Sequence, residues 1–238
     1  MDNPTPELDR PLKLPFCLKI CGVKHHETLE SVSNSGADAV GLNFFQPSVR
    51  SVDPTSAHAE SLSCEAKKLG LAAVGLFVQQ TAEDIVKIAS QLKLDCIQIH
   101  GNEPPEIISQ IRSHLSLPIV RAIKLPVGSL STKDIVHRVA PWHDLGCVLL
   151  LDADGGAQHG GSGKQLDWNT ISEWSQQSGV PWILAGGLNP DNVAQAIKVA
   201  DASAVDVASG VEVGKGCKSK ERIQAFCKNA LEALAKQA

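Results

Sequence analysis

The sequence predicts an α/β fold: a single (β/α)8 TIM barrel in which eight parallel strands, each followed by a helix, form a closed sheet. Three observations favour this fold. Short apolar segments alternate with helical segments at intervals of about 30 residues, the size of one βα unit. The tetrapeptide Ala-Val-Gly-Leu occurs at 39–42 and again at 73–76, each time after a predicted helix. Polar and glycine-rich residues directly follow the strands, where barrels of this class build their sites.

The strands are predicted from short apolar segments, because parallel strands buried on both faces are apolar along their whole length. They are expected at 16–21, 39–42, 71–78, 95–99, 118–123, 147–151, 182–185 and 203–207. Residues 1–14 are rich in proline and charge without periodicity, which predicts a flexible lead-in. The catalytic barrel domain is expected to span residues 15–238.

The helices are predicted from apolar periodicity and from residues typical of helix ends. Gly36 is expected just past the first helix, and Thr81 with Asp84 forms a near capping box for the third. Pro190 is expected in the first turn of the seventh helix. Helices are expected at 25–35, 103–114, 132–139, 168–177, 189–199 and 219–235.

The composition is that of a soluble protein. Of 238 residues, 43% are hydrophobic and 20% charged, and no apolar run approaches the roughly 18 residues of a membrane span. The net charge of −4 comes without a basic stripe, so we expect neither nucleic acid nor a membrane as a partner. Seven cysteines without zinc-type spacing, and no secretory signal before them, predict reduced thiols and a cytoplasmic location.

Lys19 and Cys21 share one face of the first predicted strand, because side chains alternate along a strand. A buried lysine is costly unless it is paired. In a closed barrel the eighth strand lies beside the first, which predicts an ion pair between Lys19 and Asp206. The positive charge is expected to lower the pKa of the Cys21 thiol. Taken alone, a cysteine here is more often a small buried apolar residue.

Asp152 directly follows the apolar strand 147–151, at the rim of the predicted barrel. Partial desolvation there is expected to raise its pKa and to suit a general acid; a structural hydrogen-bond acceptor is the alternative. The long glycine-rich loop that follows fits either a lid or a simple connection, and as a lid it brings Gly161 and Lys164 to a ligand. The segment 160–164 lacks the spacing of a Walker phosphate loop, which excludes that motif.

Two glycine-rich turns follow the seventh and eighth strands. Either turn alone would be explained as an ordinary connection between a strand and a helix. Together, Gly186-Gly187 and Ser209-Gly210 predict a phosphate site, because glycine lets an anion approach backbone N–H groups closely.

Three further polar residues lie after or within strands. Arg50 follows the second strand, and its planar fork suits a carboxylate, although a surface arginine would look the same. Gln98 and His100 share one face of the fourth strand, either as ligand contacts or as satisfied polar groups of the core.

These motifs, in this order, resemble the phosphoribosylanthranilate isomerase family from Leu18 to the C-terminus. The segments that carry the resemblance are 19–22 (KICG), 36–41 (GADAVG), 48–50 (SVR), 74–78 (VGLFV), 98–101 (QIHG), 151–152 (LD), 160–164 (GGSGK) with 167–168 (DW), and 185–190 (AGGLNP). The chain departs from the family pattern at Asn43, Ala208 and 214–218.

The resemblance implies a barrel of the ribulose-phosphate-binding type and an Amadori rearrangement in tryptophan biosynthesis. The reaction converts N-(5-phosphoribosyl)anthranilate to 1-(2-carboxyphenylamino)-1-deoxyribulose 5-phosphate. By the same resemblance, Asp152 is the general acid, Cys21 the general base, Arg50 the partner of the anthranilate carboxylate, and the glycine turns hold the phosphate. No metal or organic cofactor is implied. We expect a free-standing enzyme, monomer or homodimer.

Two alternatives stay open. A related phosphosugar isomerase of histidine biosynthesis performs the same chemistry, but that family resembles a site with two aspartates, and Cys21 argues against it. A non-catalytic barrel that binds a phosphorylated ligand is disfavoured by the presence of both Cys21 and Asp152.

Overall fold

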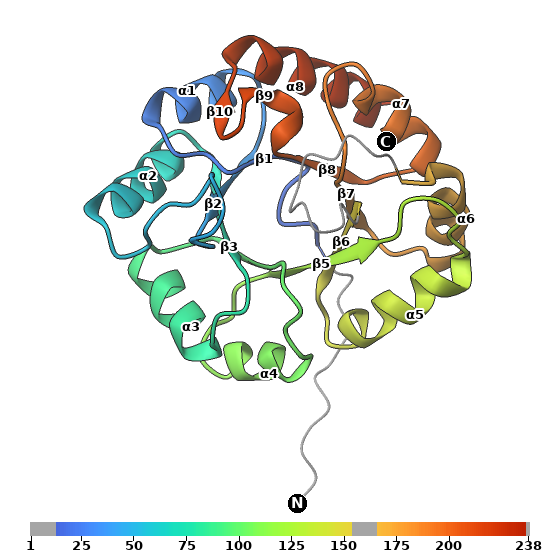
Figure 1. Cartoon of the computed structure of the whole chain (residues 1–238), viewed down its shortest axis with the longest axis horizontal. Helices are drawn as coiled ribbons and strands as arrows, with labels where there is room; N and C mark the ends of the chain where they lie inside the picture. The colour runs from blue at the N-terminus through green and yellow to red at the C-terminus, as the bar shows by residue number, and fades with distance from the viewer. Residues whose placement is uncertain (1–12, 154–165, 237–238) are drawn as a thin grey trace, which may run out of the picture.

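The computed structural model describes residues 13–153 and 166–236 and confirms the closed barrel (Figure 1). Within these residues, eight parallel strands pair in sequence order, and β8 pairs with β1 to close the sheet. The strands are β1 (Leu18–Cys21), β2 (Ala39–Asn43), β3 (Ala72–Phe77), β4 (Cys96–Ile99), β5 (Ile119–Leu125), β6 (Val148–Ala153), β7 (Trp182–Leu184) and β8 (Ala204–Val207). Each boundary lies within two residues of its predicted position.

The helices form a ring outside the strands (Figure 1). They are α1 (His26–Asn34), α2 (Ala57–Lys68), α3 (Ala82–Gln91), α4 (Glu106–Arg112), α5 (Thr132–His143), α6 (Trp168–Ser178), α7 (Val193–Ala200) and α8 (Lys220–Leu234). Several begin at a side-chain oxygen that accepts a backbone N–H of the first turn, which satisfies a donor the helix leaves free. The capping residues are Ser56, Thr81, Ser131, Asp167 and Ser219.

The apolar side chains form two layers. One face of the strands fills the barrel interior with small and branched residues, which meet in register pairs such as Val74 with Cys96 and Leu150 with Ile183. The opposite face packs against the helices in a larger cluster. This alternation is why polar residues on the inner face, such as Lys19 and Gln98, are fully buried.

Two predicted helix starts are wrong. Helix α7 begins at Val193 rather than at 189, and Pro190 lies in a turn before it. In this turn the backbone N–H of Asn189 bonds the side chain of Asn192, and the side chain of Asn189 accepts from Asp191. These bonds compete with helix formation.

Helix α4 also starts late, at Glu106 rather than at 103. The carboxylate of Glu103 is already bound outside the helix, to the backbone N–H of Gln79 at 2.6 Å and to Arg121 at 2.9 Å. Helix α5 runs past its predicted end to His143, since Trp142 in its last turn is buried beneath the Arg121 guanidinium.

A small hairpin between β8 and α8 was not predicted. The short 3-10 helix η1 (Ser209–Val211) leads into β9 (Glu212–Gly214), which pairs antiparallel with β10 (Cys217–Lys218). Figure 1 places this hairpin beside β1 and α1. The hairpin therefore lies near the pairing of β8 with β1 that closes the barrel.

Most of the predicted lead-in, residues 1–12, lies outside the described residues. Among the helices in the described part of the chain, none is long and apolar enough to cross a membrane.

Candidate active site

The predicted site residues gather at one mouth of the barrel, because parallel strands end on the same side. Cys21 ends β1, Asp152 is the penultimate residue of β6, and His100 directly follows β4. Gly186 and Ser209 come just after β7 and β8.

Below this mouth, Lys19 and Asp206 form the predicted ion pair. They are register partners on β1 and β8, and Lys19 Nζ lies 2.7 Å from the Asp206 carboxylate. The lysine side chain is wholly buried and the aspartate nearly so. Burial alone would lower the pKa of Lys19, but Asp206 and, less strongly, Cys21 raise it overall. The pair is therefore a fixed charge pair in the barrel interior.

Cys21 lies at the end of β1 and is 5% exposed. A side chain at Gly41 of β2 would place its Cβ 2.6 Å from the thiol sulfur, so Gly41 provides the space that Cys21 occupies. The prediction of a lowered thiol pKa is wrong for the unliganded protein. Burial raises the pKa of Cys21 by more than Lys19 and Lys218 lower it.

Asp152, His100 and Gln98 lie next to one another at the mouth. His100 Nε2 lies 3.3 Å from Asp152 Oδ2, and Gln98 Nε2 lies 3.1 Å from His100 Nδ1. Because the Gln98 amide nitrogen only donates, Nδ1 accepts, and the proton of a neutral imidazole faces Asp152 from Nε2. Gln98 is fully buried, and its Oε1 has no hydrogen-bond partner among the described residues. His100 thus lies beside one oxygen of the Asp152 carboxylate, and the other oxygen lies beside Gly186.

The two glycine turns pack against each other. A Cβ at Gly210 would overlap the carbonyl oxygen of Leu188 in the turn after β7. Gly186 has φ of +80°, and a Cβ there would lie 2.8 Å from Asp152 Oδ1. The turns therefore meet beside Asp152 only because both positions lack a side chain.

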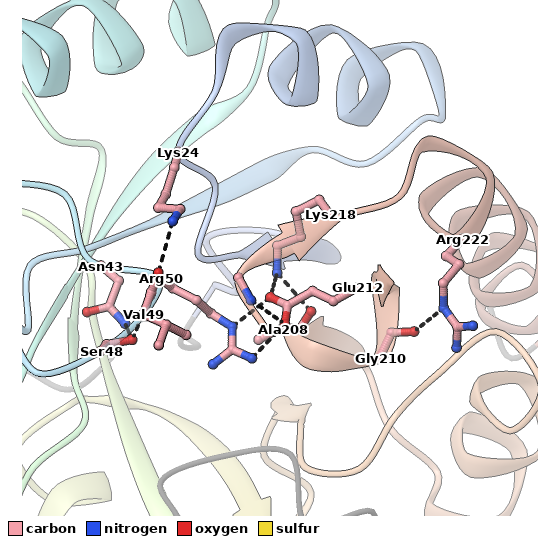
Figure 2. Close-up of polar contacts among 11 residues, drawn as sticks. Lys24, Asn43, Ser48, Val49, Arg50, Ala208, Gly210, Glu212, Lys218 and Arg222 are labelled. Carbon is pink, nitrogen blue, oxygen red and sulfur yellow. Dashed lines mark hydrogen bonds and ion pairs between the residues drawn. The ribbon is translucent and has the colours of Figure 1, made fainter. Parts of the chain in front are cut away.

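Arg50 is bound to a carboxylate of the protein itself, which the sequence did not predict. Its Nε and Nη2 each donate to one oxygen of Glu212 at 2.7 Å (Figure 2). Lys218 Nζ reaches the same carboxylate at 3.0 Å, as does the backbone N–H of Gly216. We name Arg50, Glu212 and Lys218 the mouth cluster. Glu212 and Lys218 follow the eighth strand by a few residues, but no local pattern in the sequence links them to Arg50.

Charge pairing dominates the mouth cluster. Burial opposes ionisation of Glu212, but the bonds from Arg50 and Lys218 lower its pKa to about 2. The same bond to Glu212 raises the pKa of Arg50, whereas burial lowers that of Lys218. The arginine and the carboxylate are therefore ionised at neutral pH.

Asn43 orders the turn that carries Arg50. Its Nδ2 donates to Ser48 Oγ at 3.2 Å, and Ser48 Oγ accepts the backbone N–H of Arg50 at 3.2 Å. Lys24 Nζ donates to the carbonyl of Val49 at 2.9 Å (Figure 2). The departure from the family pattern at Asn43 thus has a structural use here.

Gly161 and Lys164, predicted to contact a ligand, lie outside the described residues. Across residues 13–153 and 166–236, no three His, Cys, Asp or Glu side chains are arranged to hold a metal ion.

Comparisons with known proteins agree with this architecture. The family model for N-(5'-phosphoribosyl)anthranilate (PRA) isomerase matches residues 18–229. The chain is 39% identical over 220 residues to the N-(5'-phosphoribosyl)anthranilate isomerase of Rhodospirillum rubrum, covering 90% of this chain and 97% of that protein. It is 40% identical over 210 residues to the isomerase of Hahella chejuensis, covering 87% and 91%.

Solved structures show the same fold. The crystal structure of phosphoribosyl anthranilate isomerase from Thermotoga maritima is similar with a TM-score of 0.79 at 34% identity, covering 91% of this chain and 99% of that one. A phosphoribosyl anthranilate isomerase in complex with reduced 1-(o-carboxyphenylamino)-1-deoxyribulose 5-phosphate gives a TM-score of 0.76 at 32% identity, with coverage of 91% and 99%. The chain therefore belongs to the N-(5'-phosphoribosyl)anthranilate isomerase family.

Proposed function

We propose that this protein catalyses the Amadori rearrangement of N-(5'-phosphoribosyl)anthranilate in tryptophan biosynthesis, with Asp152 as general acid and Cys21 as general base. The observation that carries the proposal is that the thiol and the carboxylate both lie at the mouth that also bears the two glycine turns. Membership of the family, over residues 18–229, supports the reaction.

The phosphate of the substrate binds at the glycine turns. The turn that holds Gly210 contacts the turn after β7, and glycine at these positions lets an anion approach the backbone N–H groups closely. We propose that His100, just after β4, contacts the substrate together with Gln98, which lies buried beside it. We also propose that Gly161 and Lys164, in the long loop after β6, contact the substrate.

The first step opens the sugar ring. Asp152 gives its proton to the furanose ring oxygen as the bond from that oxygen to C1 breaks. The lone pair of the anthranilate nitrogen forms the C=N bond of a Schiff base, which balances the charge. His100 Nε2, which lies 3.3 Å from Asp152 Oδ2, stabilises the carboxylate that remains.

The second step removes the proton from C2. Cys21 takes it as a thiolate, and the electron pair of the C–H bond forms the C1=C2 bond of an enolamine, neutralising the Schiff base nitrogen. The enolamine then tautomerises to the ketone product. Burial raises the pKa of the Cys21 thiol, so the thiol is protonated before the substrate binds. The positive charge of the Schiff base adds to that of Lys19 and Lys218 and lowers this pKa, so that the thiol gives its own proton to solvent water before it takes the proton from C2.

Arg50 binds the anthranilate carboxylate and so places the aromatic end of the substrate. Because of this charge-assisted bond, the protein should bind this substrate more tightly than analogues that lack the carboxyl group. We propose a monomer or a homodimer; a related isomerase from Thermotoga maritima is described as dimeric.

The decisive experiment is conversion of the proposed substrate by the purified protein. N-(5'-phosphoribosyl)anthranilate is generated in place, its fluorescence is followed, and the product is identified by chromatography. Enzymatic loss of fluorescence with formation of the deoxyribulose phosphate product is expected. Failure to consume the substrate while binding it would favour a non-catalytic barrel and contradict the proposal.

A further inference from the structure

Arg50 can bind a second carboxylate without releasing the first. Its pair with Glu212 uses Nε and Nη2, the side edge of the guanidinium plane. The terminal edge still offers both protons of Nη1 and one of Nη2. Among the described residues Nη1 has no hydrogen-bond partner, and Figure 2 shows it on the side turned away from Glu212.

Glu212 is itself held firmly in place. Its side chain is 4% exposed and accepts from Arg50, from Lys218 at 3.0 Å and from the N–H of Gly216 at 3.0 Å. Lys218 is 3% exposed and also donates to the carbonyl of Ala208 at 2.8 Å, directly after β8. Displacing Glu212 would leave a buried carboxylate with fewer partners, which is costly.

The charges of the mouth cluster do not cancel. Arg50 and Lys218 each carry a positive charge and Glu212 one negative charge, which leaves the cluster with a net charge of about +1 when all three are ionised. The cluster lies close enough to the catalytic thiol for both cations to interact with Cys21 electrostatically. An anionic group of a ligand is therefore attracted to this part of the mouth.

We propose that Glu212 and Lys218 are positioning residues: from the β9–β10 hairpin they hold the side edge of Arg50, so that its terminal edge receives the substrate carboxylate end-on. This inference rests on the proposed function, because it specifies how that function recognises the aromatic end of the substrate. Glu212 stays bound to Arg50 throughout the catalytic cycle.

In the opposite role, the Glu212 carboxylate would bind Arg50 only until the substrate carboxylate arrives and displaces Glu212 from Arg50. The two roles predict opposite changes in affinity. If Glu212 positions Arg50, removing Glu212 weakens binding of the substrate carboxylate. If Glu212 competes with the substrate for Arg50, removing Glu212 strengthens that binding.

The test compares binding of two probes by calorimetry. One probe is reduced 1-(o-carboxyphenylamino)-1-deoxyribulose 5-phosphate; the other is the same compound without its carboxyl group. For Glu212→Gln we expect a Kd for the first probe raised by about tenfold or more, because losing the fixed orientation of Arg50 outweighs the added positive charge at the mouth. The Kd for the second probe should change by less than about twofold. In turnover, KM should rise by more than kcat falls.

Two further variants keep the test decisive. Lys218→Met removes the net positive charge of the mouth cluster and should also raise the Kd for the carboxylated probe but not the Kd for the other probe. If Glu212→Gln does not fold, Lys218→Met is the variant that tests the inference. Glu221→Gln, an exposed acid at the start of α8 that bonds Ser219, is the matched control and should leave both Kd values unchanged.

A Kd for the carboxylated probe that is lowered or unchanged in Glu212→Gln overturns the inference. So does an equal loss of affinity for both probes, which would mean general damage to the mouth. If the unaltered protein binds neither probe and does not convert the substrate, the proposed function itself is wrong, and that outcome is distinct from the others.

Discussion

The thiol of Cys21 lies in an environment where burial and positive charge act in opposite directions. Lys19 favours the thiolate, yet burial is the larger effect and raises the thiol pKa in the unliganded protein. Lys19 is itself kept ionised by Asp206, 2.7 Å away and on the neighbouring strand. Lys19 therefore supplies a fixed positive charge beneath Cys21, and Asp206, which raises the thiol pKa, offsets part of its effect.

Breaking this pair should affect stability and the pH profile. Lys19→Met leaves the carboxylate of Asp206 buried without a partner, which should lower the free energy of unfolding by about 3–5 kcal/mol. Without the lysine, the pKa that the Cys21 thiol contributes to the pH dependence of kcat/KM should rise. Urea unfolding and a pH–rate profile measure the two effects.

The double variant Lys19→Met/Asp206→Asn provides the control, since it removes both charges. It should recover part of the lost stability and part of the shift in the thiol pKa, because the charge of Asp206 raises this pKa. A single variant as stable as the unaltered protein would show that the pair has no structural role.

At the scale of elements, the two turns after β7 and β8 act as one unit because glycine allows them to touch. The contact of Gly210 with the Leu188 carbonyl leaves no room for a methyl group. The hairpin β9–β10 follows directly and carries two members of the mouth cluster. In the proposed binding mode, the phosphate and the carboxylate of the substrate thus both depend on the segment from η1 to β10.

Gly210→Ala should separate the turns and weaken phosphate binding. We expect KM to rise by about tenfold or more, the effect of losing a hydrogen bond to a charged group. Gly214→Ala is the matched control, because a Cβ at Gly214 has no atom within 4 Å. Steady-state kinetics of both variants test the prediction; an equal KM in the two would contradict a phosphate site at these turns.

The hairpin should also be sensitive to acid. The pKa of Glu212 is lowered to about 2 in the folded protein, so its stabilising effect is complete above the ordinary carboxyl pKa. It is lost as the pH falls from that value toward 2. The Tm of the unaltered protein should exceed that of Glu212→Gln at pH 6, and the difference should shrink steadily below about pH 4.5. A difference that does not change with pH would mean that the charge of Glu212 adds nothing to stability.

At the scale of the whole molecule, the barrel was predictable because its strands are short apolar segments spaced by one βα unit. The pairing of Lys19 with Asp206 followed from closure, since only a closed sheet brings β8 beside β1. Cys21 and Asp152 could be placed at one mouth for the same reason.

What the sequence did not show has physical causes. The hairpin escaped prediction because its strands are short and largely exposed, without apolar alternation. The Arg50–Glu212 pair joins residues 162 positions apart, and no local pattern indicates it. The direction of the Cys21 pKa depends on how deeply the thiol is buried, which only the packing around Gly41 reveals.

The central claim is that Asp152 and Cys21 supply the acid and the base, and turnover of single variants tests it most directly. The fluorescence assay is run on Cys21→Ala and Asp152→Asn, with thermal melts to confirm that each variant is folded. Each substitution should lower kcat by about 10²–10⁴-fold, the usual loss for one general acid or base. A folded variant at either position with a kcat close to that of the unaltered protein would contradict the account.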